Sequence, residues 1–152
     1  MSADSVRAFF SEKAPDIEVI DQGVSTATVA EAAVALGVSP AQIAKTLSIR
    51  IKDQVVLLVA RGDARLDNRK TRDALGARPR MLGADEVEAI TGHPVGGVCP
   101  FGLASALPVY CDISLKAFTE IYPAAGSRTT SVRITPDRLA MLVDARWVDL
   151  CV

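Results

Sequence analysis

The chain has 152 residues, of which 49% are hydrophobic and 23% charged, and its net charge at pH 7 is -1. No apolar run approaches the ~20 residues that a membrane-spanning helix needs. Residues 1–10 lack the basic and apolar regions of a signal peptide. These features predict one soluble domain over residues 1–152, with no membrane partner.

Cysteine and histidine are scarce in this chain. The cysteines (Cys99, Cys111 and Cys151) are odd in number, form no C-x-x-C pair, and are accompanied by a single histidine, His93. This supply predicts neither a disulfide framework nor a zinc site, and it favours a reducing cytoplasmic location. The sequence also contains no Walker loop and no dinucleotide-binding glycine motif, so we expect no metal and no cofactor.

The first half of the chain carries clear helix caps and two long apolar strands. Thr28 and Glu31 form a capping box at a helix start, and Gly37 supplies the C-cap. The runs 43–51 and 55–60 are separated by three residues, which predicts a hairpin whose second strand is buried on both faces. In order, the expected elements are a helix over 5–12, a strand over 17–20, a helix over 29–36, a helical turn after Ser39, and strands over 43–51 and 55–60.

The second half is expected to hold shorter elements around a glycine-rich loop. In order, these are a helix over 68–75, a strand over 78–82, a helix over 84–90, strands over 109–112, 118–122 and 129–134, a helix over 136–143, and a strand over 146–151. Runs of strands mixed with short helices predict an α+β fold in a single domain. We expect a mixed, mostly antiparallel β-sheet surrounded by short helices.

The glycine-rich loop covers residues 91–102 and holds four glycines, two prolines and the single histidine. Glycine lets the backbone reach positive φ or approach a ligand closely, and proline fixes φ and removes an amide donor. The segment is therefore a shaped loop rather than a helix or a regular strand. Glycines are also common in loops that only connect secondary-structure elements, so the composition of this loop does not by itself indicate a catalytic activity.

Few side chains in this sequence are suited to nucleophilic catalysis. No G-x-S-x-G motif occurs, and a catalytic triad would have to be built on His93. Cys99 could act as a nucleophile, although such cysteines more often pack as small apolar side chains. Lys45 stands in an otherwise apolar strand, where its ammonium group either reaches solvent or meets an anion. Thr46 should point to the opposite face of that strand.

Positive charge is concentrated in residues 61–80. This segment holds seven basic residues against three acidic ones, a net charge of +4 in a chain whose total is -1. Such a patch can follow a phosphate backbone, and it can equally be a solvated face of mixed charge. Because the whole protein is mildly acidic, we expect a modest, specific polyanion contact and no avid DNA binding.

Four motifs give the chain a resemblance to a known family. They are IAKTL at 43–47, VLLVARGD at 56–63, LDNRK at 66–70 and GHPVGGVCPFG at 92–102. With them the chain resembles the YbaK/ProX/EbsC family of free-standing aminoacyl-tRNA deacylases, related to the editing domain inserted in bacterial prolyl-tRNA synthetases. The resemblance covers residues 28–150 and departs from the family at Cys99, where many relatives carry serine or threonine.

The resemblance implies a YbaK-like fold and hydrolysis of the ester that joins a wrong amino acid to tRNA. The substrate that the resemblance implies is tRNA(Pro) carrying a small amino acid such as alanine or cysteine. Synthetases need such editing because one methylene in a pocket discriminates by only ~1–3 kcal/mol. The implied catalytic residues are Lys45, Gly96 and Gly97: the lysine holds the terminal phosphate or carbonyl region, and the glycine amides stabilise the oxyanion formed by a positioned water.

Further residues receive roles from the same resemblance. The implied substrate-binding residues are Thr46, Gly92, His93, Val98, Cys99, Pro100, Phe101 and Gly102. Pocket size is expected to depend on Val29, Ile43, Val98 and Phe101. The tRNA-contacting residues are expected to be Arg61, Arg69, Lys70 and Arg72. The expected partners are aminoacyl-tRNA, with tRNA(Pro) first, and prolyl-tRNA synthetase.

Two other functions are compatible with the residues. The chain could be a noncatalytic module that binds tRNA or a synthetase through the same pocket. It could also be a cysteine hydrolase that acts through Cys99, with His93 as the one available base. Assays of ester loss and of sensitivity to alkylation separate these alternatives.

Overall fold

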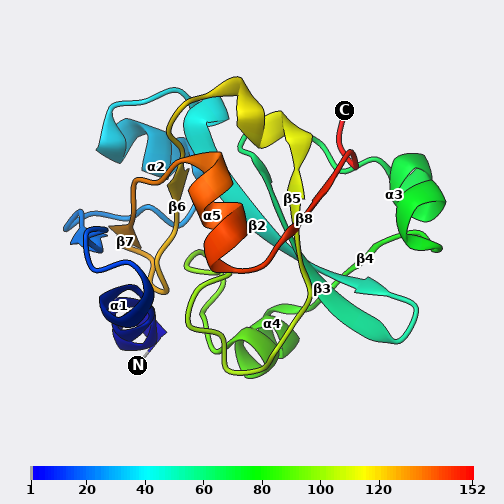
Figure 1. Ribbon diagram of the computed structural model, residues 1–152, viewed down its shortest axis with the longest axis horizontal. Helices are drawn as coiled ribbons and strands as arrows, with labels where there is room; N and C mark the ends of the chain where they lie inside the picture. Colours follow the sequence, from blue (N-terminus) through cyan, green and yellow to red (C-terminus); the bar gives the residue numbers. More distant parts are fainter. Residues whose placement is uncertain (1) are drawn as a thin grey trace.

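The computed structural model describes residues 2–152 and has an α+β fold (Figure 1). The helices are α1 (Ser2–Lys13), α2 (Val29–Leu36), α3 (Asn68–Leu75), α4 (Ala84–Thr91) and α5 (Pro136–Leu142), with 3-10 turns η1 (Pro40–Gln42) and η2 (Ile113–Ala117). The strands are β1 (Ile20–Asp21), β2 (Ile43–Ile51), β3 (Gln54–Arg61), β4 (Arg80–Met81), β5 (Val109–Asp112), β6 (Tyr122–Pro123), β7 (Thr130–Ser131) and β8 (Arg146–Val148). No helix among residues 2–152 is long and apolar enough to cross a membrane.

The main sheet is built on the β2–β3 hairpin. Its strands run in the order β4-β2-β3-β5-β8, and β6 also pairs with β2. The hairpin and the β2–β4 pair are antiparallel, whereas β6, β5 and β8 join their neighbours in parallel. The eight residue pairs of the hairpin form the longest ladder. Ten of the residue pairs in this sheet are antiparallel and eight are parallel, so the mixed, mostly antiparallel sheet that the sequence predicts is confirmed.

Both faces of the sheet are covered by buried side chains. Leu57 and Val59 of β3 belong to a large core cluster that also contains Phe10 of α1 and Leu139 of α5. The intervening residues of β3 face a second cluster on the other side. Because successive strand residues point to opposite faces, these two clusters confirm the prediction that the second hairpin strand is buried on both sides.

The predicted helix caps are present, but five predicted strands are shorter than expected. The strands predicted at 17–20 and 78–82 contract to β1 and β4, which are two residues each. The Thr28 side chain accepts a hydrogen bond from the Glu31 amide, and Gly37 ends α2. The predicted strand at 118–122 is wrong over most of its length: only Tyr122 extends into β6, and η2 occupies the segment just before it. The Asp112 carboxylate favours η2 because it accepts a hydrogen bond from the Ser114 amide at 3.0 Å.

The strands predicted at 129–134 and 146–151 are also shorter in the structure. The expected strand at 129–134 contracts to β7, which pairs with β1 in a separate two-stranded sheet. The closing strand predicted at 146–151 ends as β8 at Val148, and Cys151 forms an isolated bridge with Leu66. Alternating apolar residues gave these segments a strand pattern, but their partners offer only two or three residues for pairing.

Candidate functional site

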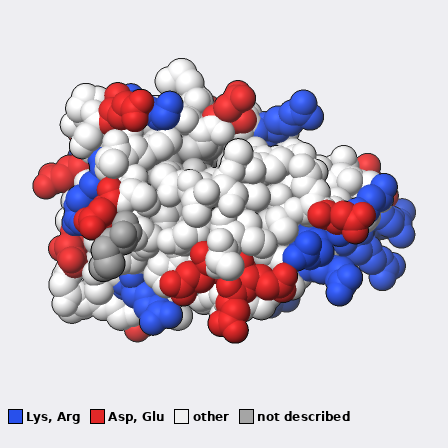
Figure 2. All heavy atoms as spheres, turned by 90° about the horizontal axis from the view of Figure 1, so that it is seen from below, with Lys and Arg blue, Asp and Glu red and all other residues white. Residues whose placement is uncertain are grey.

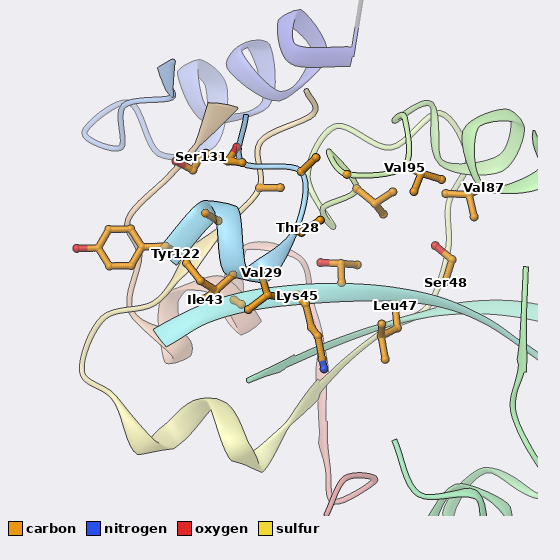
Figure 3. A pocket seen from close by; sticks show the side chains of 18 of the residues that line it. Thr28, Val29, Ile43, Lys45, Leu47, Ser48, Val87, Val95, Tyr122 and Ser131 are labelled. Carbon is orange, nitrogen blue, oxygen red and sulfur yellow. The ribbon is translucent and has the colours of Figure 1, made fainter. Parts of the chain in front are cut away.

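A pocket of about 250 Å³ opens along one edge of β2, between the places where β4 and β6 pair with that strand. Its walls come from the N-terminal end of α2, residues 43–48 of β2, Val87 of α4 and the glycine-rich loop. Tyr122 and Ser131 close it from the side of β6 and β7 (Figure 3). Val29, Ile43 and Val98 line it as the sequence predicts, whereas Phe101 does not.

The backbone of β2 has free hydrogen-bonding groups at this edge. β6 pairs with residues 43–44 of β2, and β4 pairs with residues 49–50. Between them, the Leu82 amide makes one long contact of 3.5 Å with the Ser48 carbonyl. Alternate residues of an antiparallel strand direct their peptide groups to the same edge. The Thr46 peptide group therefore faces the pocket without a strand partner.

Two buried hydroxyl groups also lie at this edge without hydrogen-bond partners. Within residues 2–152, neither Thr46 Oγ1 nor Ser48 Oγ has one, although both atoms are closed from solvent. Each side chain lies on the sheet face of its β3 partner, Val59 for Thr46 and Leu57 for Ser48. Sequence analysis selected Thr46 and missed Ser48. A serine inside an apolar strand run was the signal for it.

Lys45 is the one charged residue among the described residues that line the pocket. Its side chain leaves β2 on the side opposite Ser48 (Figure 3), where Nζ donates a hydrogen bond to the Ala64 carbonyl. Burial lowers the pKa of Lys45, and the negative charge of Asp63 opposes that shift only in part. Lys45 therefore contributes to the pocket lining, while its ammonium group lies on the face of β2 opposite the two hydroxyl groups.

Three residues of the glycine-rich loop line the pocket: Val95, Gly96 and Val98. Gly96 lines the pocket with φ at +93°, and a Cβ there would lie 2.8 Å from Ala27 Cβ. Gly97 does not line the pocket, and its amide donates to the Pro94 carbonyl at 2.8 Å. That bond occupies the donor that sequence analysis assigned to the oxyanion. In the described part of the chain, the amides of Gly96 and Val98 donate no hydrogen bond.

The conspicuous side chains of this loop lie in the core. His93, Cys99 and Phe101 are each 0% exposed and do not line the pocket. His93 Nε2 donates to the Phe101 carbonyl at 2.7 Å and lies 3.7 Å from Cys99 Sγ. Burial raises the pKa of Cys99 to about 12, so the thiol stays protonated at neutral pH.

The remaining predicted substrate-binding residues are also away from the pocket. Gly92 is the C-cap of α4, Pro100 is buried, and a Cβ on Gly102 would lie 2.6 Å from the Ser5 carbonyl oxygen. Of the substrate-binding residues that the resemblance implies, Thr46 and Val98 line the pocket. The others hold the loop against the core.

We expect Cys99→Ala to keep the deacylase activity that the family resemblance implies within about threefold of the wild type, because the protonated thiol of Cys99 is buried behind the loop. Treatment of the folded wild-type protein with iodoacetamide should likewise leave the rate unchanged, since Cys111 and Cys151 are buried too. Rates of ester loss from mischarged tRNA measure both effects. Inactivation by the substitution and by alkylation together would establish the cysteine-hydrolase alternative.

Comparison with known proteins decides the family. Residues 24–142 match the aminoacyl-tRNA editing domain. The chain belongs to this family. It is 46% identical to YwhH of Bacillus subtilis, over 99% of the chain and 98% of that protein. It is 29% identical to EbsC of Enterococcus faecalis, named for Cys-tRNA(Pro)/Cys-tRNA(Cys) deacylation, over 84% of the chain and 77% of that protein.

A solved structure supports the same assignment. It is described as a trans-editing enzyme for prolyl tRNA synthetase, and it superposes with a TM-score of 0.91 at 32% identity, over 99% of this chain and 97% of that one. Editing of aminoacyl-tRNA is hydrolysis of the aminoacyl ester, so this editing domain is an aminoacyl-tRNA deacylase. The family and the enzyme class predicted from the sequence are confirmed.

The basic residues of the editing domain gather at the end that carries α3 (Figure 2). Three of the four predicted tRNA-contacting residues pair with acidic neighbours: Arg61 with Asp63 at 2.6 Å, Lys70 with Asp149 at 3.0 Å and Arg72 with Asp73 at 3.6 Å. Arg69 is exposed and has no ion pair within the described residues, and the same holds for Arg65, Arg78 and Arg80.

Proposed function

We propose that this editing domain acts in trans on tRNA(Pro) that carries a small amino acid such as alanine or cysteine. The observation that carries the proposal is the pocket of about 250 Å³ at the free edge of β2, with Lys45 among its lining residues. A pocket of this volume suits one small amino acid. A phosphate at the tRNA end can meet the Lys45 ammonium, because a cation on a flexible stem serves well as a phosphate ligand.

The aminoacyl group enters along the β2 edge. Its ammonium and carbonyl groups can pair with the Thr46 peptide in the way that an added strand residue would. Free amides at Gly96 and Val98 are suited to stabilise the oxyanion that forms when water attacks the ester carbonyl. Gly96 is retained from the predicted pair, and the Val98 amide takes the place of the Gly97 amide, which donates to the Pro94 carbonyl.

The proton of the attacking water goes to the substrate in this mechanism. The described pocket lining holds neither a carboxylate nor an imidazole group that could act as a general base. A hydroxyl group of the terminal ribose can orient the water. Water adds to the carbonyl carbon and the bond from that carbon to the ribose oxygen breaks, so the products are the free amino acid and tRNA with its hydroxyl restored.

A substrate panel tests the proposed function. We expect Ala-tRNA(Pro) and Cys-tRNA(Pro) to lose their ester at least about 10-fold faster than Pro-tRNA(Pro), because a pocket sized for small groups excludes the pyrrolidine ring. Release of labelled amino acid measures the rates. Binding of tRNA without ester loss would instead establish the noncatalytic module, and equal rates for all three esters would contradict the proposed selectivity.

Arg69 of α3, which has no ion pair within the described residues, gives a second prediction. We expect Arg69→Ala to raise KM for mischarged tRNA about two- to fivefold with kcat unchanged, and to weaken the salt dependence of binding by about one phosphate contact. The matched control is Arg7→Ala, which removes an exposed helical arginine from α1 at the opposite end of the molecule. KM measured from 50 to 200 mM salt checks the effect. Equal changes in both variants would place the tRNA elsewhere.

Docking on prolyl-tRNA synthetase stays a prediction from the family resemblance, and a cytoplasmic location stays a prediction from the cysteine usage. Retention of the editing domain on immobilised synthetase, with and without tRNA(Pro), tests the docking directly.

A further inference from the structure

Ser48 has a buried polar group that the fold itself does not use. The residue is 4% exposed, and within residues 2–152 its hydroxyl group has no hydrogen-bond partner. Most buried polar side-chain atoms in native proteins have a partner, because leaving one unsatisfied destabilises the fold. Thr46 Oγ1, two residues earlier on the same strand face, is in the same condition. Two hydroxyl groups without partners among the described residues, two residues apart in one pocket wall, indicate that a group of the bound ligand forms hydrogen bonds with them.

The surroundings of Ser48 are otherwise apolar. Its side chain points from β2 to the same side as Val87 and Val95 (Figure 3), and Met81 and Leu82 line the pocket beside them. Lys45 points to the other side of the strand, so its ammonium group does not serve these hydroxyl groups. A small apolar compartment with hydroxyl groups on one wall is complementary to a short side chain that ends in a hydrogen-bonding group.

We propose that Ser48, supported by Thr46, is a specificity residue that selects aminoacyl esters with a hydroxyl or thiol group on a short side chain. This rests on the proposed function and narrows it: seryl and cysteinyl esters are preferred over alkyl esters of equal size. A site that hydrogen-bonds a substrate hydroxyl discriminates strongly against an analogue without it, because the buried groups of the site are then left unpaired. An alkyl side chain of the same length fills the space and leaves both hydroxyl groups unsatisfied.

Matched substrates isolate this hydrogen bond. Seryl-tRNA(Pro) and 2-aminobutyryl-tRNA(Pro) differ by an oxygen in place of a methyl group, and cysteinyl-tRNA(Pro) and alanyl-tRNA(Pro) complete the set. We expect wild-type kcat/KM for the seryl ester to exceed that for the 2-aminobutyryl ester by about 10- to 100-fold. In Ser48→Ala this ratio should fall to about 1, through loss on the seryl and cysteinyl esters with little change on the alkyl esters. Thr46→Val, which keeps the shape of the side chain, should reduce the ratio in part.

Thermal unfolding distinguishes a specificity role of Ser48 from a structural role. Because Ser48→Ala removes an unsatisfied buried group, we expect its Tm in the absence of tRNA to equal or exceed the wild-type value. The matched control is Ser39→Ala, which removes an exposed hydroxyl group that makes no cap hydrogen bond. It should leave both Tm and the ester ratio unchanged.

The outcomes separate the inference from the function on which it rests. If wild-type protein hydrolyses alkyl and hydroxyl esters equally, or if Ser48→Ala lowers all four rates by the same factor, the specificity role is overturned and the deacylase stands. A marked fall in Tm for Ser48→Ala would assign the hydroxyl group to the fold and overturn the inference too. If none of the four esters is hydrolysed, the proposed function fails and the inference fails with it.

Discussion

Lys45→Ala is expected to lower deacylation of mischarged tRNA(Pro) by about 10²–10³-fold, the usual loss when one preorganised electrostatic contact to the reacting group is removed. The lysine supplies the only positive charge in the described pocket lining. Without it, the phosphate at the tRNA end loses its ligand, and the ester carbonyl is no longer held against the free amides of the glycine-rich loop. Single-turnover release of labelled alanine or cysteine measures the loss.

Two companion variants separate charge from packing in that experiment. Lys45→Met retains an unbranched stem of similar length and should be as inactive as Lys45→Ala, because only the ammonium group is missing from both. Lys13→Ala removes an exposed lysine at the end of α1 and should keep wild-type activity. Circular dichroism should show wild-type folding for all three, since the one hydrogen bond lost at Lys45 is to the Ala64 carbonyl. A Lys45→Ala protein with wild-type activity would refute the mechanism.

Local sequence patterns correctly predicted part of the secondary structure that surrounds the pocket. The capping box at Thr28, the C-cap at Gly37 and the β2–β3 hairpin depend on residues close in sequence, and all three are as predicted. The motif around Lys45 and the glycine-rich loop indicated the right part of the molecule, because both contribute to the pocket wall. What could be predicted was therefore the set of segments that meet at the site.

The free edge of β2 could not be predicted from local sequence patterns. It exists because β4 and β6, each two residues long, pair with β2 on either side of a gap. Such short strands leave too few residues for a period-2 pattern, and their pairing is settled by the packing of the whole chain. A serine inside an apolar strand run was the one signal for Ser48, and without that edge it did not show that the hydroxyl group has no hydrogen-bond partner within residues 2–152.

The same limit explains why the sequence did not show which residues of the glycine-rich loop line the pocket. Histidine and cysteine attract attention because they are chemically versatile, yet His93 and Cys99 are fully buried and contact one another and the Phe101 carbonyl. Sequence position could not tell which side of the loop faces the core. Pairing of the Gly97 amide with Pro94 is a property of the turn, and it transfers the donor role to the neighbouring amides.

Gly97→Ala is expected to reduce deacylation by about 10- to 100-fold, for a reason that concerns packing. A Cβ at Gly97 would lie 2.7–2.8 Å from the backbone N, Cα and C atoms of Ser127, which cannot rotate away as a side chain could. The Gly126 amide also donates to the Gly97 carbonyl at 3.0 Å, so the two segments are joined at the point of the clash. The substitution must therefore separate the glycine-rich loop from the segment that leads through Thr130 into Ser131, and Ser131 lines the pocket.

The stability cost distinguishes this clash from loss of a chemical group. Forcing an extra methyl group into a close-packed contact costs about 1–3 kcal/mol, which lowers Tm by several degrees in a protein of this size. Gly83→Ala is the matched control, because a Cβ there would have only Glu86 Oε1 as a neighbour, at 3.9 Å. Rates should be compared at a temperature where both variants are fully folded by circular dichroism. If Gly97→Ala then matches Gly83→Ala in rate and Tm, contact between the loop and Ser127 does not shape the pocket; if it stays slow while folded, the backbone position of the loop governs the chemistry.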